Sequence, residues 1–475
     1  MVTRKSVSEV IDDSRHLTKR YWSFAVAVAV ATIFEYFDLF VIGYVVAFVG
    51  PRWGLSFGQS AIVLIASGVG AMVGALIAGW ASDRFGRKTV LLISLASCGA
   101  ATGFMAIVPD GAWPVLALLR LLVGAAVPAM HLAAITLVVE WTPTRWRTTL
   151  SSLMAVAFVP IGGLLAALAA SWSDVLGWRG LVMLGWTAVL LLPILWAVIP
   201  ESARWLSAIG EGKRAQTVAQ WFTGTRLETE ISAAPAADCE TSFADLFRNR
   251  ANVWLVAMTW LGISTVTYAM VLWGPSFVRL TLNIPPAQMA SLFIFVALGG
   301  LAGRIAASFV AGWLGRRATG VIFAVGSAAM LLLISLLHGH APIEAFAFFP
   351  MWAVAYFFTD GGWANAGPMP FELFPTALRS QAGGFAQFMN GIGKIIGPMI
   401  LGLIAGAGNL ITPQATIEAI TPAFVVLTGF SLLVALTYAR VRAETHGRSL
   451  EELSAGATAG PVNLLTVTAR STNEP

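Results

Sequence analysis

The sequence predicts an all-α membrane protein with twelve transmembrane helices in two pseudo-symmetric six-helix bundles. Of the 475 residues, 57% are hydrophobic and 11% are charged, whereas soluble domains carry about 25% charged residues. Apolar stretches of about 20 residues, the length that crosses a bilayer, recur along the whole chain. Short motifs also repeat between the two halves of the chain, which predicts that the halves share one architecture.

Polar segments divide the predicted spans into two sets of six. The longest of them, residues 201–250, is expected to link a bundle formed by 22–200 to a second bundle formed by 251–441. Residues 1–21 and 442–475 are polar terminal segments. The apolar stretches lie near residues 22–49, 58–80, 89–108, 113–140, 148–171, 180–199, 252–275, 287–312, 318–338, 343–368, 382–406 and 419–440.

The distribution of Lys and Arg predicts the orientation of the spans. Placing the linker and both termini in the cytoplasm leaves only six of the 29 Lys and Arg residues outside cytoplasmic segments. The positive-inside rule therefore predicts cytoplasmic termini, in a plasma membrane of the bacterial inner-membrane type. The first apolar stretch is too long for a removable signal peptide and lacks a small-residue cleavage site, so we expect it to remain as a span. The six residues are Arg52, Arg179 and Arg279 in outer loops and Arg120, Arg304 and Lys394 within spans.

Composition argues against several other classes of protein. The formal net charge of +5 comes without a basic stripe interleaved with aromatic residues, so nucleic acid is not an expected partner. The two cysteines, Cys98 and Cys239, cannot build a disulfide framework or a zinc site. The sequence has no nucleophile elbow, P-loop or His/Cys metal cluster, so we expect neither an enzyme nor a cofactor beyond a coupling proton. We expect a monomer that acts on a small molecule within the lipid bilayer.

Two motif pairs form the internal repeat. Glu140–Arg147 (EWTPTRWR) follows the fourth span and Glu372–Arg379 (ELFPTALR) follows the tenth, with Glu, Pro, Thr and Arg at an offset of 232. Gly86–Lys88 (GRK) and Gly315–Arg317 (GRR) follow the second and eighth spans at an offset of 229. Two matches at nearly one offset predict parallel halves, an architecture of secondary transporters whose site lies between the halves.

The segment after the second span, Gly79–Lys88 (GWASDRFGRK), resembles the signature of the major facilitator superfamily. The resemblance covers the whole chain except its two tails. It implies a cytoplasmic latch made by Asp83, Arg84 and Arg87, in which Asp83 accepts charge-assisted hydrogen bonds. The second-half copy has Gly312 in place of the acid, so we expect the latch in the first half only. The alternative is a charged turn whose basic residues are simply retained inside.

Acid–base pairs after spans 4 and 10 are candidates for a gate. Glu140 with Arg147, and Glu372 with Arg379, together with Pro200–Leu206 (PESARWL), look like those of the sugar porter and organic-ion branch of the superfamily. Opposite charges at cytoplasmic helix ends can pair between bundles and separate when the inner gate opens. Because exposed ion pairs contribute only about 0–1 kcal/mol, a purely solvated role for some of them is the alternative.

The first span carries Glu35 and Asp38 on one helical face. A carboxylate near the middle of a bilayer costs at least roughly 2.5 kcal/mol, so both need partners, water or protonation. The segment Glu35–Asp38 (EYFD) resembles the acidic pair of the aromatic acid:proton symporter family, and is similar to that of metabolite:proton symporters. It departs from the first family in having Glu35 for an aspartate and Tyr36 for a glycine. The resemblance implies proton coupling at Asp38 and Glu35; the alternative is that Asp38 only ties helices together.

Arg120 in the fourth span is the predicted partner of Asp38. Arg120–Pro128 (RLLVGAAVP) is similar to the Arg-x3-Gly signature of proton-coupled members of the superfamily. At a rise of about 1.5 Å per residue, Arg120 and Asp38 both lie in the outer half of the membrane. We expect them to pair when Asp38 is deprotonated and to separate on protonation. His131 lies on the same face as Arg120 and is either a helix–helix hydrogen bonder or a contact for substrate or proton.

The second half replaces the acidic pair by a lysine. Lys394 in the eleventh span shares a face with Gln387 and Asn390. Asp360 in the tenth span lies at a comparable depth, so we expect it to neutralise Lys394 until a substrate carboxylate competes. The alternative is a permanent structural pair of Asp360 and Lys394. Arg304 in the eighth span is a further cationic candidate, able to reach toward the inner interface.

Aromatic residues fall into two groups by position. Those at expected span ends, including Trp172, Trp178 and Trp313, are typical interfacial anchors. Those near mid-span beside polar residues are candidates for stacking on an aromatic substrate; they are Phe34, Tyr268, Tyr356 and Trp363.

Together these patterns favour a proton-coupled importer of a small organic anion, an aromatic or related carboxylate, that works by alternating access. The proton would bind at Asp38 and Glu35 and the anion near Lys394. A proton-coupled polyol, sugar or other metabolite porter is an alternative that the gate motifs favour. An exporter of drugs or metabolites, and a membrane receptor that senses without transporting, are further alternatives.

Overall fold

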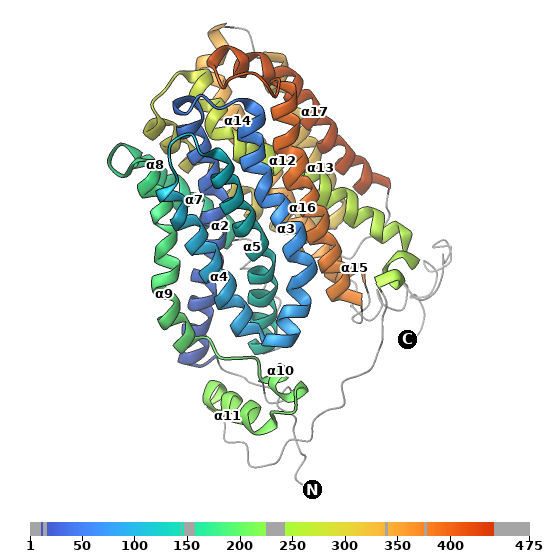
Figure 1. The fold of residues 1–475 in the computed structure, drawn as a ribbon. Coiled ribbons are helices and arrows are strands. Elements are labelled where there is room, and N and C mark those ends of the chain that lie inside the picture. The colour runs from blue at the N-terminus through green and yellow to red at the C-terminus, as the bar shows by residue number, and fades with distance from the viewer. Residues whose placement is uncertain are drawn as a thin grey trace, which may run out of the picture.

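The computed structural model describes residues 11–12, 17–143, 145–146, 157–224, 243–337, 341–374 and 378–440, with the side chains of 243, 341–347, 379 and 380 excepted. The described helices form two bundles (Figure 1). The first contains α2 (Lys19–Arg52), α3 (Phe57–Phe85), α4 (Arg87–Phe104), α5 (Trp113–Trp141), α7 (Val159–Ser171), α8 (Ser173–Met183) and α9 (Gly185–Val198). The second contains α12 (Arg250–Leu282), α13 (Pro286–Leu337), α14 (Ala341–Ala366), α16 (Arg379–Ile404) and α17 (Pro413–Arg440).

The helices account for the twelve predicted crossings. In the described part of the chain, eight helices are long and apolar enough to span a bilayer, and α8 with α9, bent by 51°, forms a ninth. The 52-residue α13 holds two crossings, because Gly315 (φ 82°, ψ 169°) breaks the helix where a loop was expected. The shorter apolar α7 is the described part of the fifth span, and α14 is the tenth.

Local sequence signals set several helix boundaries. The Thr18 side chain accepts a hydrogen bond from the Tyr21 amide at the start of α2. Ser56 and Gln59 form a capping box at the start of α3, which satisfies two otherwise unpaired amides. Gly86 separates α3 from α4 with φ 91°, a conformation that favours glycine. A Cβ atom there would also meet the Glu201 carboxylate. Both the backbone conformation and the lack of space therefore favour glycine at this turn of the predicted motif.

Small residues let α3 and α5 approach closely. A Cβ atom on Gly70 or Gly74 of α3 would collide with the backbone of α5 near Leu121 and Ala125, and one on Gly124 would collide with Ser67. Without a hydrophobic driving force between helices in lipid, such close backbone contacts supply the packing energy. This pair therefore fixes the wall of the first bundle beside which Arg120 lies.

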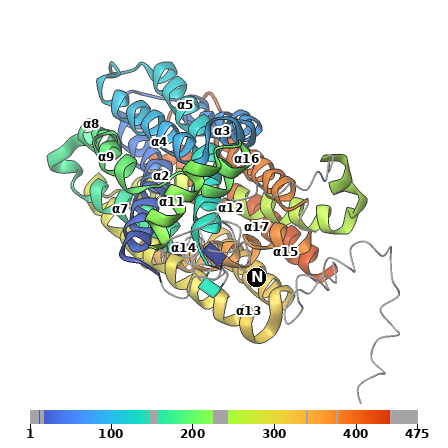
Figure 2. The ribbon, with the colours of Figure 1, turned by 90° about the horizontal axis from the view of Figure 1, so that it is seen from below.

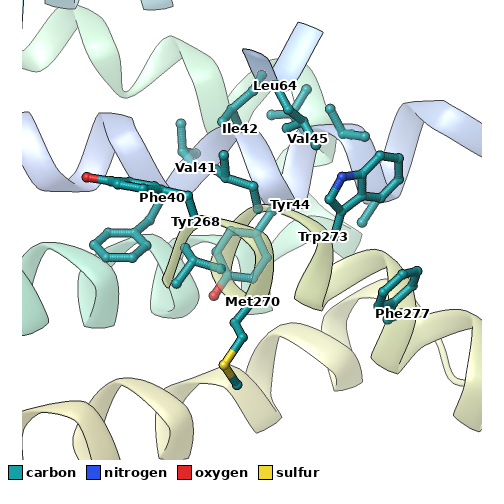
Figure 3. Close-up of a cluster of buried hydrophobic side chains, with 14 of the residues drawn as sticks. Phe40, Val41, Ile42, Tyr44, Val45, Leu64, Tyr268, Met270, Trp273 and Phe277 are labelled. Carbon is teal, nitrogen blue, oxygen red and sulfur yellow. The ribbon is translucent and has the colours of Figure 1, made fainter. Parts of the chain in front are cut away.

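The two bundles meet along three helix pairs. α2 packs against α12, α3 against α16, and α7 against α13 (Figure 2). In each pair one helix comes from each half of the chain. Residues of α2 and α12 from this contact, including Tyr44, Tyr268 and Met270, belong to one buried hydrophobic cluster (Figure 3).

The core is continuous between the bundles at one end of the molecule and divided at the other. We call the end that carries α10 (Ala203–Ala208) and α11 (Gly212–Thr223) the linker end, and the opposite end the far end (Figure 1). The cluster of the far half contains residues of both bundles, such as Val45 and Trp273. Near the linker end, one cluster around Trp141 belongs to the first bundle and another around Tyr438 to the second. The bundles are therefore joined at the far end and separate at the linker end.

Backbone hydrogen bonds close the far end. The Phe57 amide donates to the Asn409 carbonyl (2.9 Å), and the Ile411 amide donates to the Leu55 carbonyl (3.1 Å). These bonds connect the segment between α2 and α3 to the segment between α16 and α17, in opposite bundles. The Phe57 and Trp273 rings, 5.6 Å apart, pack directly beneath this connection.

The two linker helices attach to the first bundle. Phe222 at the end of α11 lies among aromatic rings of α2 and α5, with centroid separations of 5.8 Å to Tyr21 and 4.3 Å to Trp141. Arg204 of α10 pairs with Asp12, with nitrogen–oxygen distances of 3.1 Å. α10 and α11 are therefore held by the first bundle, while η3 (Phe243–Arg248) contacts the second bundle through Phe247 and Phe385.

Candidate functional site

Asp38 is buried in the first bundle and surrounded by hydrogen-bond donors. Its carboxylate accepts hydrogen bonds from the Thr102 hydroxyl and from the Cys98 thiol (3.3 Å), both on α4. The Arg120 guanidinium of α5 lies 3.4 Å from the carboxylate and donates to the Asp38 backbone carbonyl at 3.1 Å. The predicted contact between Asp38 and Arg120 is therefore confirmed. The sequence did not predict Thr102 or Cys98 as partners of Asp38, because these neutral residues carry neither a charge nor a motif that points to it.

Arg120 has hydrogen-bonding capacity to spare. It is completely buried, and its Nε and Nη2 have no hydrogen-bond partner among the described residues. Its ion-pair partner there is Asp38. Breaking a buried ion pair by neutralising one partner leaves an uncompensated charge, which is strongly destabilising. Protonation of Asp38 would therefore force Arg120 to find a new partner or a new environment.

Glu35 and His131 form a second contact one turn away on α2. His131 Nδ1 lies 3.4 Å from Glu35 Oε1, and the other carboxylate oxygen is buried without a partner in the described residues. The His131 side chain keeps 23% of its surface exposed, whereas Glu35 is buried. The Tyr36 ring lies edge-on to His131, with centroids 6.4 Å apart. Of the two alternatives for His131, this contact favours a role beside the acidic pair.

Asp360 pairs with Arg304 rather than with Lys394. Arg304 Nε and Nη2 donate to the two carboxylate oxygens at 2.7 and 2.9 Å, and both residues are buried. The expectation that Asp360 neutralises Lys394 is therefore wrong, as is the idea that Arg304 reaches toward the inner interface. Helical rise gave the depth of each residue but not the neighbouring helix. α13 carries Gly300, where a Cβ atom would lie 2.9 Å from the Asp360 carboxylate, so the two helices approach closely enough for a bidentate pair.

Lys394 lies between the bundles without an acidic partner. The residue is 7% exposed, and no carboxylate lies within 4 Å of its ammonium in the described part of the chain. Its ammonium lies 5.0 Å from the centroid of the Tyr268 ring. Its backbone and Cβ adjoin Gly68 of α3, in the opposite bundle.

Polar side chains form hydrogen bonds between α16, which carries this lysine, and its neighbour α12, and between α12 and α14. Ser264 donates to Asn390 at 2.9 Å, and Asn390 donates to Gln387 at 3.1 Å. The Trp363 indole donates to Thr267 at 3.0 Å, and its ring lies 5.1 Å from that of Trp260. Gln387 and Asn390 thus belong to one hydrogen-bonded group of α12 and α16, and Trp363 to a second group of α12 and α14; we call the two together the polar wall.

Two further aromatic candidates occupy different places. Phe34 packs edge-on against Phe37 within α2, with centroids 6.4 Å apart. Tyr356 lies beside Asp360, since a Cβ atom on Gly300 would touch both side chains. Tyr356 therefore borders the Arg304–Asp360 pair, whereas Phe34 belongs to the hydrophobic packing of the first bundle near the linker end.

The gate candidates pair within each bundle in this conformation. Arg87 lies 3.0 Å from Asp83 and 3.8 Å from Glu140. Arg316 donates to Glu372 at 3.0 Å. The expected pairing between the bundles applies to a closed inner gate, whereas the bundles are separate at the linker end in this conformation.

The two ion pairs are related by the internal repeat. Arg87 and Arg316 are equivalent positions of the repeated motif, and so are Glu140 and Glu372. The latch expected from Asp83 is a separate contact, for which the second half has Gly312 in place of the acid. The Arg–Glu contact, which the sequence analysis did not predict, recurs in both halves. Arg84 is exposed.

The remaining linker-end motif residues include Glu201, which bridges two helices. Arg147 and the side chain of Arg379 lie outside the described residues. Glu201, in the Pro200–Leu206 motif, accepts hydrogen bonds from the amides of Lys88 (3.1 Å) and Ser202 (2.9 Å). It thereby ties the start of α4 to the end of α9.

Comparisons with known proteins agree with this architecture. The chain is 28% identical over 411 residues to the gallate transporter of Pseudomonas putida, covering 83% of this chain and 88% of that protein. It is 27% identical over 375 residues to the cis,cis-muconate transport protein of Acinetobacter baylyi, covering 78% and 85%. Its fold matches the partially occluded inward-open conformation of the xylose transporter XylE from E. coli with a TM-score of 0.69 at 17% identity, covering 91% of this chain and 100% of that one.

The family model described as sugar (and other) transporter matches residues 23–456, which is most of the chain. The protein is therefore an integral membrane transporter and not an enzyme. The chain belongs to the sugar (and other) transporter family of the major facilitator superfamily.

Proposed function

We propose that this transporter is a proton-coupled symporter that imports a small organic anion, an aromatic or related carboxylate. The observation that carries the proposal is Lys394, a buried ammonium between the bundles with no carboxylate within 4 Å in the described residues. An unpaired buried charge is costly, and a bound anion would remove that cost. The gallate and muconate transporters, which resemble this chain over most of its length, carry names of organic acids and support this substrate class.

The proton would bind in the first bundle. Asp38 has one guanidinium contact of 3.4 Å, and Arg120 keeps two donors without partners in the described residues. Protonation of Asp38 would remove the charge that holds Arg120 and so favour a different arrangement of α2, α4 and α5. Glu35 with His131 would relay the proton toward the space between the bundles.

Alternating access would follow from tilting of the two bundles. The bundles of residues 22–200 and 251–441 would act as the two moving units, joined by residues 201–250. By the positive-inside rule the linker end faces the cytoplasm, so the described conformation, closed at the far end, faces inward. Symport lowers the cost of crossing because the anion is neutralised by Lys394 and the coupled acid by its proton before the site closes. We expect one chain to suffice.

Uptake by proteoliposomes tests the proposal. An inward proton gradient should accelerate benzoate uptake, and Asp38→Asn should abolish accumulation against a gradient while leaving exchange measurable. Lys394→Gln should weaken carboxylate binding strongly, whereas Lys213→Gln on the exposed face of α11 serves as the matched control. Full accumulation by Asp38→Asn, or undiminished binding by Lys394→Gln, would contradict the proposal.

A polyol or sugar porter is the second candidate, favoured by the wall of Gln387, Asn390 and Trp363. Amide and indole groups of this kind can hydrogen-bond to sugar hydroxyls. Competition separates the two functions, because free acids should inhibit uptake of the anion and their methyl esters should not. Inhibition by xylose with no effect of free acids would favour the sugar porter. Uptake into vesicles of known orientation would distinguish import from the export of drugs or metabolites.

A further inference from the structure

We infer that Arg279 is a gating residue, which holds the far end closed by donating a hydrogen bond to a carbonyl that Pro51 leaves free on α2. The inference rests on the alternating access of the proposed function, although not on its substrate. The Arg279 guanidinium, in the last turn of α12, donates to the Ala47 carbonyl of the opposite bundle. The sequence predicted an outer loop for Arg279, whereas the structure places it at the end of a helix that packs against α2.

Pro51 makes the Ala47 carbonyl available for this bond. Within a regular helix the carbonyl would accept a hydrogen bond from the amide of residue 51, but proline has no N–H to donate. Ala47 is 1% exposed, so bulk water has little access to this carbonyl. A buried carbonyl without a partner is unfavourable, and in membrane helices a neighbouring helix commonly satisfies a backbone group that proline has freed. Arg279 supplies that donor from the other bundle.

The same two helices share a second carbonyl of this kind. Pro275 lies inside α12 and removes the usual donor of the Val271 carbonyl. A Cβ atom on Gly43 of α2 would lie 2.9 Å from this carbonyl oxygen, so the glycine lets the two helices approach there. Each helix therefore presents to the other a carbonyl that a proline has freed, Ala47 on α2 and Val271 on α12.

Arg279 has no acidic partner in the described part of the chain. No carboxylate there lies within 4 Å of its guanidinium, whereas Arg52 and Arg179, also at the far end, both pair with Asp110. A hydrogen bond from a cation to a neutral carbonyl contributes less than a buried ion pair. The strength of the Arg279–Ala47 bond therefore suits a contact that must break in every transport cycle.

Opening of the far end would exchange this bond for water without damage to either helix. Val45 and Trp273, which lie between the two contacts along α2 and α12, are completely buried in the cluster that joins the bundles (Figure 3). Separation of the helices would admit water to this layer, and water would then hydrate both the guanidinium and the Ala47 carbonyl. Because the prolines have already removed the internal bonds at these carbonyls, opening breaks no hydrogen bond within a helix.

Hydrogen exchange at the far end tests the inference without a substrate. The amides of Phe57 and Gly58 lie in the first turn of α3, where a helix offers them no partner. They donate instead to the carbonyls of Asn409 (2.9 Å) and Ala407 (3.0 Å) in the second bundle, so their protection reports closure of the far end. Exchange is followed by mass spectrometry on the full chain in nanodiscs.

Arg279→Met keeps an apolar stem and removes the donor. Loss of a hydrogen bond from a charged group should speed exchange of the Phe57 and Gly58 amides by about ten- to a hundredfold. Arg179→Met is the matched control, because Arg179 also donates to far-end carbonyls, but to those of Ala106 (3.0 Å) and Val108 (3.1 Å) in its own bundle. It should leave exchange of the two amides unchanged. Thermal unfolding verifies that each variant is folded.

Pro51→Ala tests the origin of the free carbonyl. Alanine restores an amide that can bond to Ala47 within α2, so it should weaken the hold of Arg279 and speed exchange. The effect should be smaller than that of Arg279→Met, because a carbonyl can accept a second bond. In the Arg279→Met background, Pro51→Ala should have no further effect. Pro193→Ala inside α9 is the control. Since alanine favours helix, Pro51→Ala is expected to fold even if Arg279→Met does not.

The outcomes separate the inference from the proposed function. The inference is overturned by unchanged exchange in folded Arg279→Met, by equal acceleration in Arg179→Met, or by an effect of Pro51→Ala that is the same with and without Arg279. If the unmodified protein shows proton-driven benzoate uptake in those cases, the proposed function stands without this gating residue. If it transports no carboxylate, the proposed substrate falls, and exchange measured without substrate still decides the role of Arg279.

Discussion

Replacement of Thr102 by valine should move the pH dependence of transport to higher pH. The Thr102 hydroxyl donates a hydrogen bond to Asp38, and valine removes that donor while keeping the shape of the side chain. A hydrogen bond to a charged group contributes about 1.5–3 kcal/mol, and one pH unit corresponds to about 1.4 kcal/mol. Because the bond favours the deprotonated acid, its loss favours protonation and should raise the midpoint by about 1–2 units.

The assay measures benzoate uptake by proteoliposomes from pH 5 to pH 9, with inner and outer pH varied together for exchange and separately for accumulation. Thr102→Ser should restore the midpoint of the unmodified protein, because serine keeps the hydroxyl. Cys98→Ala should produce a smaller shift, because a thiol is a weak donor and its sulfur lies 3.3 Å from the carboxylate. Thr428→Val is the matched control, since in the described part of the chain that buried hydroxyl donates to the Phe424 carbonyl of its own helix alone, at 2.8 Å. A midpoint that stays in place in a folded Thr102→Val protein would refute proton coupling through Asp38.

Three other predictions concern the fold. Arg304→Leu or Asp360→Leu alone should cost about 3–5 kcal/mol of unfolding free energy, while the double replacement recovers much of it; additive losses in thermal unfolding would contradict this. Ser56→Cys with Leu410→Cys should form a disulfide, because the two residues are bridge partners, and should block transport until a reductant is added; transport by the oxidised protein would show that the far end need not open. Gly70→Val should prevent accumulation of folded protein, because a side chain would meet the α5 backbone; a normal elution profile in gel filtration would contradict that packing.

The predictions that succeeded depend on properties carried by consecutive residues. Twelve apolar stretches and the turn at Gly86 follow from hydropathy and backbone freedom, which act within one segment. The Asp38–Arg120 contact could be predicted because both spans carry motifs that resemble those of proton-coupled transporters. The turn expected after the eighth span lies at Gly315, whose non-helical backbone (φ 82°, ψ 169°) breaks α13 there.

The predictions that failed required knowledge of which helices are neighbours. Asp360 and Lys394 have similar depths, and depth was all that helical rise supplied. Asp360 pairs with Arg304 because α13 and α14 make close contact at Gly300. That contact depends on how the helices pack in the bundle. The Thr102 hydroxyl and the Cys98 thiol, which donate to Asp38, come from α4. The middle of that span has no charged residue, so nothing in its sequence indicated a contact with Asp38.

The two buried acids, Asp38 and Asp360, differ in their hydrogen-bond partners, and this difference favours different roles. Both oxygens of Asp360 accept charge-assisted hydrogen bonds from one guanidinium, at 2.7 and 2.9 Å, so protonation of Asp360 would remove the charge on which this bidentate pair depends. Asp38 is held by one longer contact and by two neutral donors, which tolerate either protonation state better than a second cation would. Arg120 Nε and Nη2 have no hydrogen-bond partner among the described residues, and a changed arrangement of the helices can supply one. The geometry therefore favours a permanent pair in the second bundle and an exchangeable one in the first, and a transporter that couples a proton to bundle motion requires the exchangeable kind.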